Sequence, residues 1–167
     1  MAIVLIGGGA RSGKSRYALD RARQEGANLL FIATALPEDQ EMRARIARHR
    51  SDRGDAFTTI EAPRDLAPVI RAADHPAIVV DCLTLWLSNV LFDPGRVVEE
   101  EIAALEAAAS ASPACVIFVT NEVGCGIVPD HAVAREFRDR AGLLNQAIAQ
   151  AAAEVYWMVF GQPLRIK

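Results

Sequence analysis

Near its start the chain reads Gly8-Gly9-Ala10-Arg11-Ser12-Gly13-Lys14-Ser15, between an apolar run, residues 2–6, and a helix-like run, residues 16–24. This stretch fits the pattern G-x-x-x-x-G-K-[ST] in the strand–loop–helix context that the pattern requires. The glycines let backbone N–H groups turn inward around phosphate oxygens, and the following helix adds the positive end of its dipole. The sequence therefore predicts a loop that binds a nucleoside triphosphate.

Three side chains complete the predicted phosphate site. Lys14 is expected to reach the outer phosphates, and the hydroxyl of Ser15 is expected to hold Mg²⁺. Asp81 follows the apolar run 77–80, so it should emerge at the carboxyl end of a strand, where nucleotide-hydrolysing folds place an acidic group for the metal. The alternative is that Asp81 caps a helix starting near residue 82, since Asp also serves well in that position.

Length and composition limit the class of protein. The chain has 167 residues, of which 51% are hydrophobic, so we expect a single domain spanning 1–167. Its net charge of −3 argues against a nucleic-acid partner, because general nucleic-acid binders are usually basic. No apolar run approaches the roughly 20 residues that span a bilayer, so we expect no membrane insertion. Three cysteines at irregular spacing and no signal segment predict a cytoplasmic protein with reduced thiols.

Apolar runs alternate with helical segments along the chain. Five runs read as buried strands: 2–6, 29–33, 77–80, 115–119 and 155–160. Six segments read as helices: 16–24, 38–53, 66–73, 83–92, 97–109 and 132–152. Residues 163–167 are expected to add an edge strand, and 107–113 to form a solvent-exposed hinge. The alternation predicts an α/β fold of the P-loop NTPase-like, three-layer type, a mostly parallel sheet with helices on both faces.

Five arginines crowd around His49 in residues 43–53. If this segment is helical, Arg45, His49 and Arg53 share one face, since residues three and four apart are neighbours on a helix. A neutral imidazole can attack phosphorus, and guanidinium groups can stabilise the charge that develops on the phosphate. Its narrow apolar stripe suggests a lid over the sheet edge. The alternative is a solvated basic helix with an incidental histidine.

With these pieces in place, the chain resembles the bifunctional adenosylcobinamide kinase/adenosylcobinamide-phosphate guanylyltransferase family of cobalamin biosynthesis. The resemblance rests on segments spread over the whole chain, in the family's order: Gly8–Ser15, Ile32–Ala35, Asp39–Met42, Arg45-Ile46, His49-Arg50, Asp81–Leu87, Thr120–Gly124, Gly126–Pro129, Phe137–Asp139, Gly142 and Leu144–Gln146.

The resemblance implies two successive reactions and a homotrimer. Adenosylcobinamide is first phosphorylated with ATP or GTP, and GMP is then transferred from GTP to adenosylcobinamide-phosphate, giving adenosylcobinamide-GDP and pyrophosphate. The second reaction passes through a guanylylated histidine in the family, and His49 matches that position. The resemblance and the phosphate-loop pattern together make these residues candidates for nucleotide contact: Gly8, Gly9, Ala10, Arg11, Ser12, Gly13, Lys14, Ser15, Thr34, Ala35, Leu36, Arg50, Ser51, Asp52, Arg53, Glu61 and Asp81.

The sequence leaves three points open. Glu61 ends the short run 57–60, where an acidic residue can equally be a solvated strand end. Thr120-Asn121-Glu122 closes another strand and could contact substrate or metal, but it lacks the Asn-Lys-x-Asp pattern of a guanine-reading switch. The other function classes are a simple P-loop small-molecule kinase, in which His49 forms no covalent bond, and a non-catalytic nucleotide-binding module.

Overall fold

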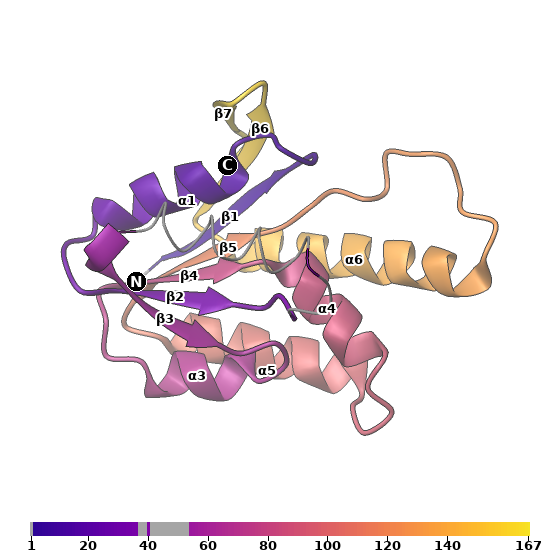
Figure 1. Ribbon diagram of the computed structural model, residues 1–167, viewed down its shortest axis with the longest axis horizontal. Coiled ribbons are helices and arrows are strands. Elements are labelled where there is room, and N and C mark those ends of the chain that lie inside the picture. The colour runs from indigo at the N-terminus through magenta and orange to yellow at the C-terminus, as the bar shows by residue number, and fades with distance from the viewer. Residues whose placement is uncertain (1, 37–39, 41–53) are drawn as a thin grey trace.

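The computed structural model describes residues 2–36, 40 and 54–167. Within these ranges the chain forms one seven-stranded sheet in the order β3-β2-β4-β5-β1-β6-β7 (Figure 1). The strands are β1 (Ile3–Gly8), β2 (Leu29–Ala33), β3 (Phe57–Glu61), β4 (Ala77–Asp81), β5 (Cys115–Val119), β6 (Glu154–Val159) and β7 (Gln162–Arg165). All neighbouring strands are parallel except β6 and β7, which form an antiparallel hairpin.

The helices lie on both faces of the sheet, which confirms the predicted layers. They are α1 (Lys14–Arg23), α3 (Leu66–Ala72), α4 (Leu83–Leu91), α5 (Val98–Ala111) and α6 (Ala132–Ala151), and a short turn of 3₁₀ helix spans Gly54–Ala56. Alternate residues of β1 divide the core: Val4 and Ile6 pack toward α1, whereas Ile3 and Leu5 pack toward α3 to α6. This alternation follows from the two-residue period of a strand.

The central strands form because their residues are apolar on both faces. Every residue of β1 and β5 is buried, as expected for strands covered by helices on either side. The outer strands differ. β7 is exposed throughout and contains Pro163, which lacks an N–H donor and is therefore tolerated at a sheet edge. The predicted edge strand near the carboxyl terminus is thus confirmed.

Two features of the sheet depart from the sequence analysis. β3, which the sequence suggested only as a short run before Glu61, is the sixth parallel strand and pairs with β2 along its length. The predicted exposed hinge over 107–113 is wrong: α5 continues to Ala111, and Ala108, Ala109 and Ser112 are buried. Ala108 and Ala109 have small side chains that pack into the core. The alanine-rich stretch predicted to be a solvated linker is therefore part of the core.

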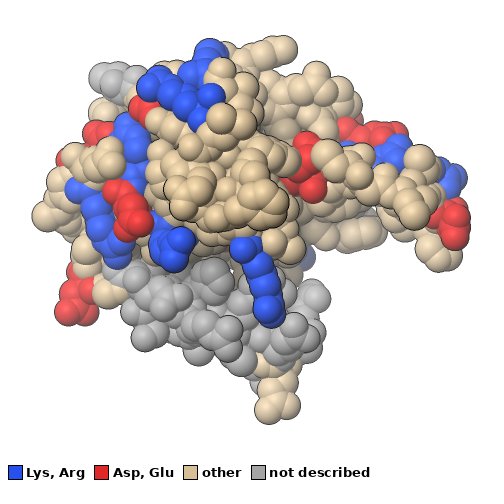
Figure 2. All heavy atoms as spheres, turned by 90° about the horizontal axis from the view of Figure 1, so that it is seen from above, with Lys and Arg blue, Asp and Glu red and all other residues tan. Residues whose placement is uncertain are grey.

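Surface charge is mixed on the face seen in Figure 2, where Lys and Arg side chains alternate with Asp and Glu. None of the helices in the described ranges is both long enough and apolar enough to cross a membrane.

One polar cluster ties α1 to β6. Arg21 of α1 donates to Glu154 of β6 at 2.9 Å and to Glu25 at 2.6 Å, and the hydroxyl of Tyr156 donates to Glu154 at 2.7 Å. The Arg21 guanidinium, followed by the Tyr156 hydroxyl, holds the pKa of the Glu154 carboxyl below its usual range. Because α1 carries the end of the phosphate loop, this ion pair fixes the loop's helix to the sheet.

We expect Glu154→Gln to destabilise the fold by about 1–3 kcal/mol at pH 7, since hydrogen bonds to charged groups contribute this much. A carboxyl whose pKa is lowered by folding stabilises the protein above its unfolded pKa of about 4.3, and that contribution disappears as the pH falls through the folded pKa. The difference in free energy of unfolding between the wild type and Glu154→Gln should therefore be smaller at pH 3.5 than at pH 7. Urea unfolding followed by circular dichroism measures this difference.

Glu100→Gln, at an exposed position of α5, is the matched control and should change stability by less than about 0.5 kcal/mol. If Glu154→Gln lowers the free energy of unfolding equally at both pH values, packing and not the carboxylate charge connects β6 to α1.

Candidate active site

The loop between β1 and α1 has a backbone that only glycine adopts easily at two positions. Gly8 has φ +148° and Gly13 has φ +94°. A Cβ on Gly8 would lie 2.9 Å from the Ser12 hydroxyl oxygen and 3.0 Å from the carbonyl oxygen of Met158 in β6. The loop thus turns tightly against the neighbouring strand, and the carbonyl of Gly13 accepts the first hydrogen bond of α1, from Tyr17.

Lys14 lies over this loop. Its side chain is 7% exposed, and its ammonium donates to the Gly9 carbonyl at 2.5 Å and to the Ser12 hydroxyl at 3.4 Å. A buried ammonium held over a tight loop at the start of a helix forms a concentrated positive potential. This arrangement can bind and orient the phosphates of a nucleotide.

Asp81 occupies the last position of β4, at the edge of the sheet where β1 also ends. The helix cap of α4 is Cys82, so the alternative that Asp81 caps this helix is excluded. The Asp81 carboxylate is half-buried and has no hydrogen-bond or ion-pair partner in the part of the chain that the structure describes. A half-buried carboxylate at the edge of the sheet where the phosphate loop begins is a ligand that suits Mg²⁺ bound together with phosphate oxygens.

The Thr34 hydroxyl fixes the backbone next to Asp81. It accepts from the N–H of Cys82 at 2.7 Å and donates to the carbonyl of Cys82 at 2.9 Å, and Thr34 itself is fully buried. Burial, reinforced by the nearby Asp81 carboxylate, raises the pKa of the Cys82 thiol to about 11. Cys82 is therefore a neutral thiol, and Thr34 positions the end of β4 through it.

The other predicted nucleotide contacts fall in two groups. Ala35 and Leu36 follow β2, and Glu61 ends β3, so all three lie at the carboxyl edge of the sheet near Asp81, with Glu61 exposed. His49, Arg50, Ser51, Asp52 and Arg53, and the helix predicted over 38–53, lie outside the described residues.

A second polar network holds the loop that follows β5. The N–H of Asn121 donates to the Thr84 hydroxyl at 2.8 Å, and the Thr120 hydroxyl donates to Asn145 of α6 at 2.7 Å. Asn145 also donates to the carbonyl of Asn121 at 3.4 Å. These bonds join the start of α4 and the end of β5 to α6, so that the loop leaves the sheet in a defined direction.

Glu122 lies next in this loop and contacts the phosphate loop directly. Its N–H donates to the carbonyl of Gly8 at 3.4 Å, and one carboxylate oxygen accepts from the N–H of Gly124 at 2.6 Å. A Cβ on Gly124 would lie 2.8 Å from that oxygen, so a larger residue at this position would displace the Glu122 carboxylate. A carboxylate is thereby placed beside the phosphate-binding loop.

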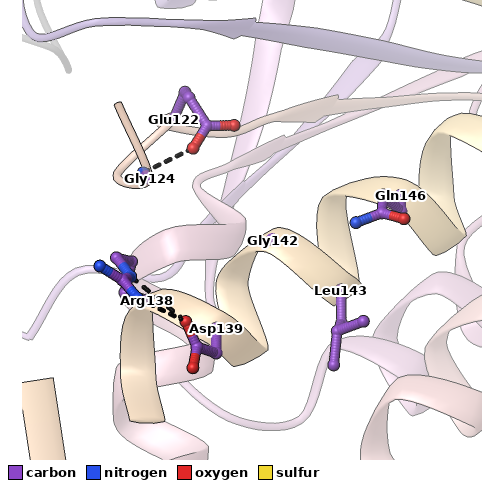
Figure 3. A pocket seen from close by; sticks show the side chains of 7 residues that line it. All are labelled: Glu122, Gly124, Arg138, Asp139, Gly142, Leu143 and Gln146. Atoms are coloured by element: carbon purple, nitrogen blue, oxygen red, sulfur yellow. Dashed lines mark hydrogen bonds and ion pairs between the residues drawn. The ribbon is translucent and has the colours of Figure 1, made fainter. Parts of the chain in front are cut away.

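Between this loop and α6 the surface is hollowed into a groove of about 370 Å³ (Figure 3). Glu122 and Gly124 line one side, and consecutive turns of α6 line the other. The helical residues are Arg138, Asp139, Gly142, Leu143 and Gln146. The groove therefore combines two carboxylates, a guanidinium, an amide and an apolar side chain.

Sequence reasoning missed one supporting residue, Asn89 of α4. Its amide donates to the carbonyls of Thr34 at 2.8 Å and of Pro63 at 2.9 Å, which joins the segments following β2 and β3. The sequence contained a signal for this role, because Asn89 is a polar residue within an apolar helix. Such residues usually satisfy buried backbone groups.

Known proteins match almost the whole chain. The family model described as cobinamide kinase / cobinamide phosphate guanyltransferase matches residues 4–166. The bifunctional adenosylcobalamin biosynthesis protein CobU of Escherichia coli (strain K12) is 40% identical over 181 residues, covering 99% of this chain and 99% of that protein. The bifunctional adenosylcobalamin biosynthesis protein CobP of Pseudomonas aeruginosa is 44% identical over 167 residues, covering 98% of this chain and 96% of that protein.

Among solved structures, the RadB recombinase has a TM-score of 0.53 and 14% sequence identity, covering 93% of this chain and 73% of that one. This likeness shows the fold alone, and it confirms the predicted P-loop NTPase-like α/β architecture.

We expect Thr34→Val to lower the stability of the protein by about 1–3 kcal/mol, because the buried N–H of Cys82 loses its partner, whereas the Cys82 carbonyl keeps the N–H of Trp86. This loss corresponds to a Tm lower by roughly 2–4 °C per kcal/mol for a chain of this size. Thr34→Ser, which keeps the hydroxyl, is the matched control and should lose less. A Thr34→Val variant with unchanged Tm in calorimetry would exclude this positioning role.

Proposed function

This chain belongs to the cobinamide kinase / cobinamide phosphate guanyltransferase family, and we propose how its residues carry out the two reactions of this bifunctional enzyme of adenosylcobalamin biosynthesis. First, adenosylcobinamide is phosphorylated with ATP or GTP. Second, GMP is transferred from GTP to adenosylcobinamide-phosphate through a guanylylated His49, giving adenosylcobinamide-GDP and pyrophosphate. The observation that carries the proposal is the buried Lys14 ammonium over the tight loop at Gly8.

In the kinase step the substrate hydroxyl attacks the γ-phosphorus, and the bond from that phosphorus to the bridging oxygen breaks. The nucleoside diphosphate leaves with the electron pair, and the hydroxyl proton passes to a base. Lys14 and the amides of the phosphate loop hold the phosphates while negative charge moves toward the leaving group. The protein thus contributes mainly position and electrostatic stabilisation.

In the transferase step the acceptor of GMP is first the imidazole of His49. Its neutral nitrogen attacks the α-phosphorus of GTP and pyrophosphate leaves. An oxygen of adenosylcobinamide-phosphate then attacks the same phosphorus, the N–P bond breaks, and the imidazole is restored. The arginines predicted around His49 are suited to neutralise the phosphates during both displacements.

Mg²⁺ is proposed as the metal of both steps, with Ser15 and Asp81 as its protein ligands. When bound, it would neutralise phosphate charge and orient the triphosphate. Support comes from the half-buried Asp81 carboxylate at the edge where the phosphate loop lies, which has no ion-pair partner among residues 2–36, 40 and 54–167. The Thr34–Cys82 hydrogen bonds keep this carboxylate at a fixed position on β4.

We also propose that the chain acts as a homotrimer and in the cytoplasm. The trimer follows only from the family resemblance. The cytoplasmic location is consistent with three free cysteines at positions 82, 115 and 125, since disulfides are rare in the cytosol.

The covalent step is tested with GTP labelled at the α-phosphate. We expect the purified protein, incubated with Mg²⁺ and this GTP and then denatured, to retain label in an acid-labile, base-stable bond, because phosphoramidates have this stability. His49→Ala should retain none. Absence of label from a folded, GTP-binding wild type would instead favour the simple P-loop kinase, in which His49 makes no covalent bond.

The metal proposal is tested with Asp81→Asn, which preserves size but removes the charge. We expect kcat/KM of the kinase step to fall about 10²–10³-fold, and the MgCl₂ concentration for half-maximal rate to rise, because one metal ligand is weakened. Asp74→Asn, at an exposed position before the opposite end of the same strand, is the control and should leave the rate near that of the wild type. An unchanged MgCl₂ dependence of Asp81→Asn would contradict the assignment.

A further inference from the structure

The groove between the loop after β5 and α6 has no role in the nucleotide chemistry described so far. Three of the segments that carry the family resemblance, Thr120–Gly124, Phe137–Asp139 and Leu144–Gln146, meet around it together with Gly142. Figure 3 shows Glu122 and Gly124 on the loop and the five helical lining residues along the neighbouring turns of α6. The groove lies beside the phosphate loop, because Glu122 bonds to Gly8.

Gly142 supplies the first observation. It lies in the interior of the 20-residue helix α6, where glycine is less favourable than alanine. No positive φ requires glycine there, and a Cβ built on Gly142 would meet no atom within 4 Å. Packing within the described chain therefore gives no reason for glycine at this position. The missing side chain leaves a smooth floor in the groove, where a bound molecule can approach the helix backbone closely.

Glu122 supplies the second observation. Its backbone N–H bonds to Gly8, so the residue is anchored directly to the phosphate loop. One carboxylate oxygen is occupied by the N–H of Gly124, which fixes the orientation of the group. The other oxygen accepts no hydrogen bond from the described part of the chain. A carboxylate oriented by a hydrogen bond beside the proposed triphosphate site, with one oxygen available, is suited to accept a proton.

We propose that this groove binds cobinamide for the kinase step and that Glu122 accepts the proton of its reacting hydroxyl. The inference rests on the proposed function and adds the acceptor site to it. The hydroxyl oxygen attacks the γ-phosphorus as its proton moves to the Glu122 carboxylate. The bond to the bridging oxygen breaks, and the nucleoside diphosphate leaves. The protonated carboxyl then returns its proton to solvent.

The lining of the groove fits a corrinoid. Such a molecule has an apolar ring fringed with carboxamide groups, which both donate and accept hydrogen bonds. Arg138 and Asp139 form an ion pair with each other at 3.1 Å, in which only one Asp139 oxygen is used. Gln146 offers both a donor and an acceptor, and Leu143, which is 64% exposed, offers apolar surface. A groove of about 370 Å³ is smaller than a whole corrinoid. It therefore holds the edge of the ring that carries the hydroxyl arm, and the remainder stays outside.

The first test is Gly142→Ala, with kinase rates measured against cobinamide and against ATP separately. We expect KM for cobinamide to rise about 5–50-fold, because the added methyl group occupies the groove floor, whereas KM for ATP stays within twofold. We also expect Tm to stay equal or to rise by about 2–4 °C, since alanine favours the helix. Gln150→Ala, an exposed position of α6 outside the groove, is the control and should change neither KM.

The second test is Glu122→Gln, which keeps an oxygen for the N–H of Gly124 but cannot accept a proton. We expect kcat of the kinase step to fall about 10²–10⁴-fold with KM for ATP near the wild-type value. Labelling of the chain by α-labelled GTP without any corrinoid should persist, because that half-reaction does not use the acceptor.

The outcomes separate this proposal from the proposed function. A wild type that phosphorylates cobinamide, together with a Gly142→Ala variant of unchanged KM for cobinamide, would overturn the groove assignment alone. A Gly142→Ala variant that changes the mass of the assembly in light scattering, but not KM, would instead assign the groove to contacts between copies of the chain. A wild type without kinase activity on cobinamide would overturn the proposed function itself.

Discussion

The position of β1 between β5 and β6 is the constraint on which the site depends. Both pairings are parallel, so the three strands end at the same edge, and Gly8 leaves the sheet beside Met158. The space at that point is so small that a Cβ on Gly8 would clash with the carbonyl of Met158. The loop turns tightly at this point, and Lys14 folds back over it to the carbonyl of Gly9.

Hydrogen bonds at the carboxyl edge of the sheet hold together the segments that form the site. The hydroxyl of Thr34 satisfies both backbone groups of Cys82, and Asn121 is held by Thr84 of the following helix. These bonds join neighbouring strand ends that the sheet ladder no longer holds. Because these backbone groups bond to residues that follow the neighbouring strands, the ends of β2, β4 and β5 are positioned together.

Both proposed reactions use a triphosphate on the same loop, the kinase step at the γ-phosphorus and the transferase step at the α-phosphorus. The side chains on either side of the loop indicate how one loop can support both. Glu122 lies against the phosphate loop on the β5 side, whereas Glu61 and the segment after β2 lie across β4 from β5. Under the proposed function, the acceptor alcohol would approach the triphosphate from the Glu122 side. The two chemistries would share the phosphate loop and differ in the groups that approach it.

The sequence alone was enough to predict the strand–loop–helix at residues 8–15, Asp81 at a strand end and the helices on both faces, because each depends on local pattern or on hydrophobic periodicity. It did not reveal that the Thr34 hydroxyl bonds to Cys82 or that Asn89 joins two loops, since these contacts connect residues 48 and 55 positions apart. It also gave no reason for a glycine inside α6. Only the tertiary structure decided these points, because a hydrogen bond or an open groove depends on which distant backbone groups and surfaces the folded sheet brings together.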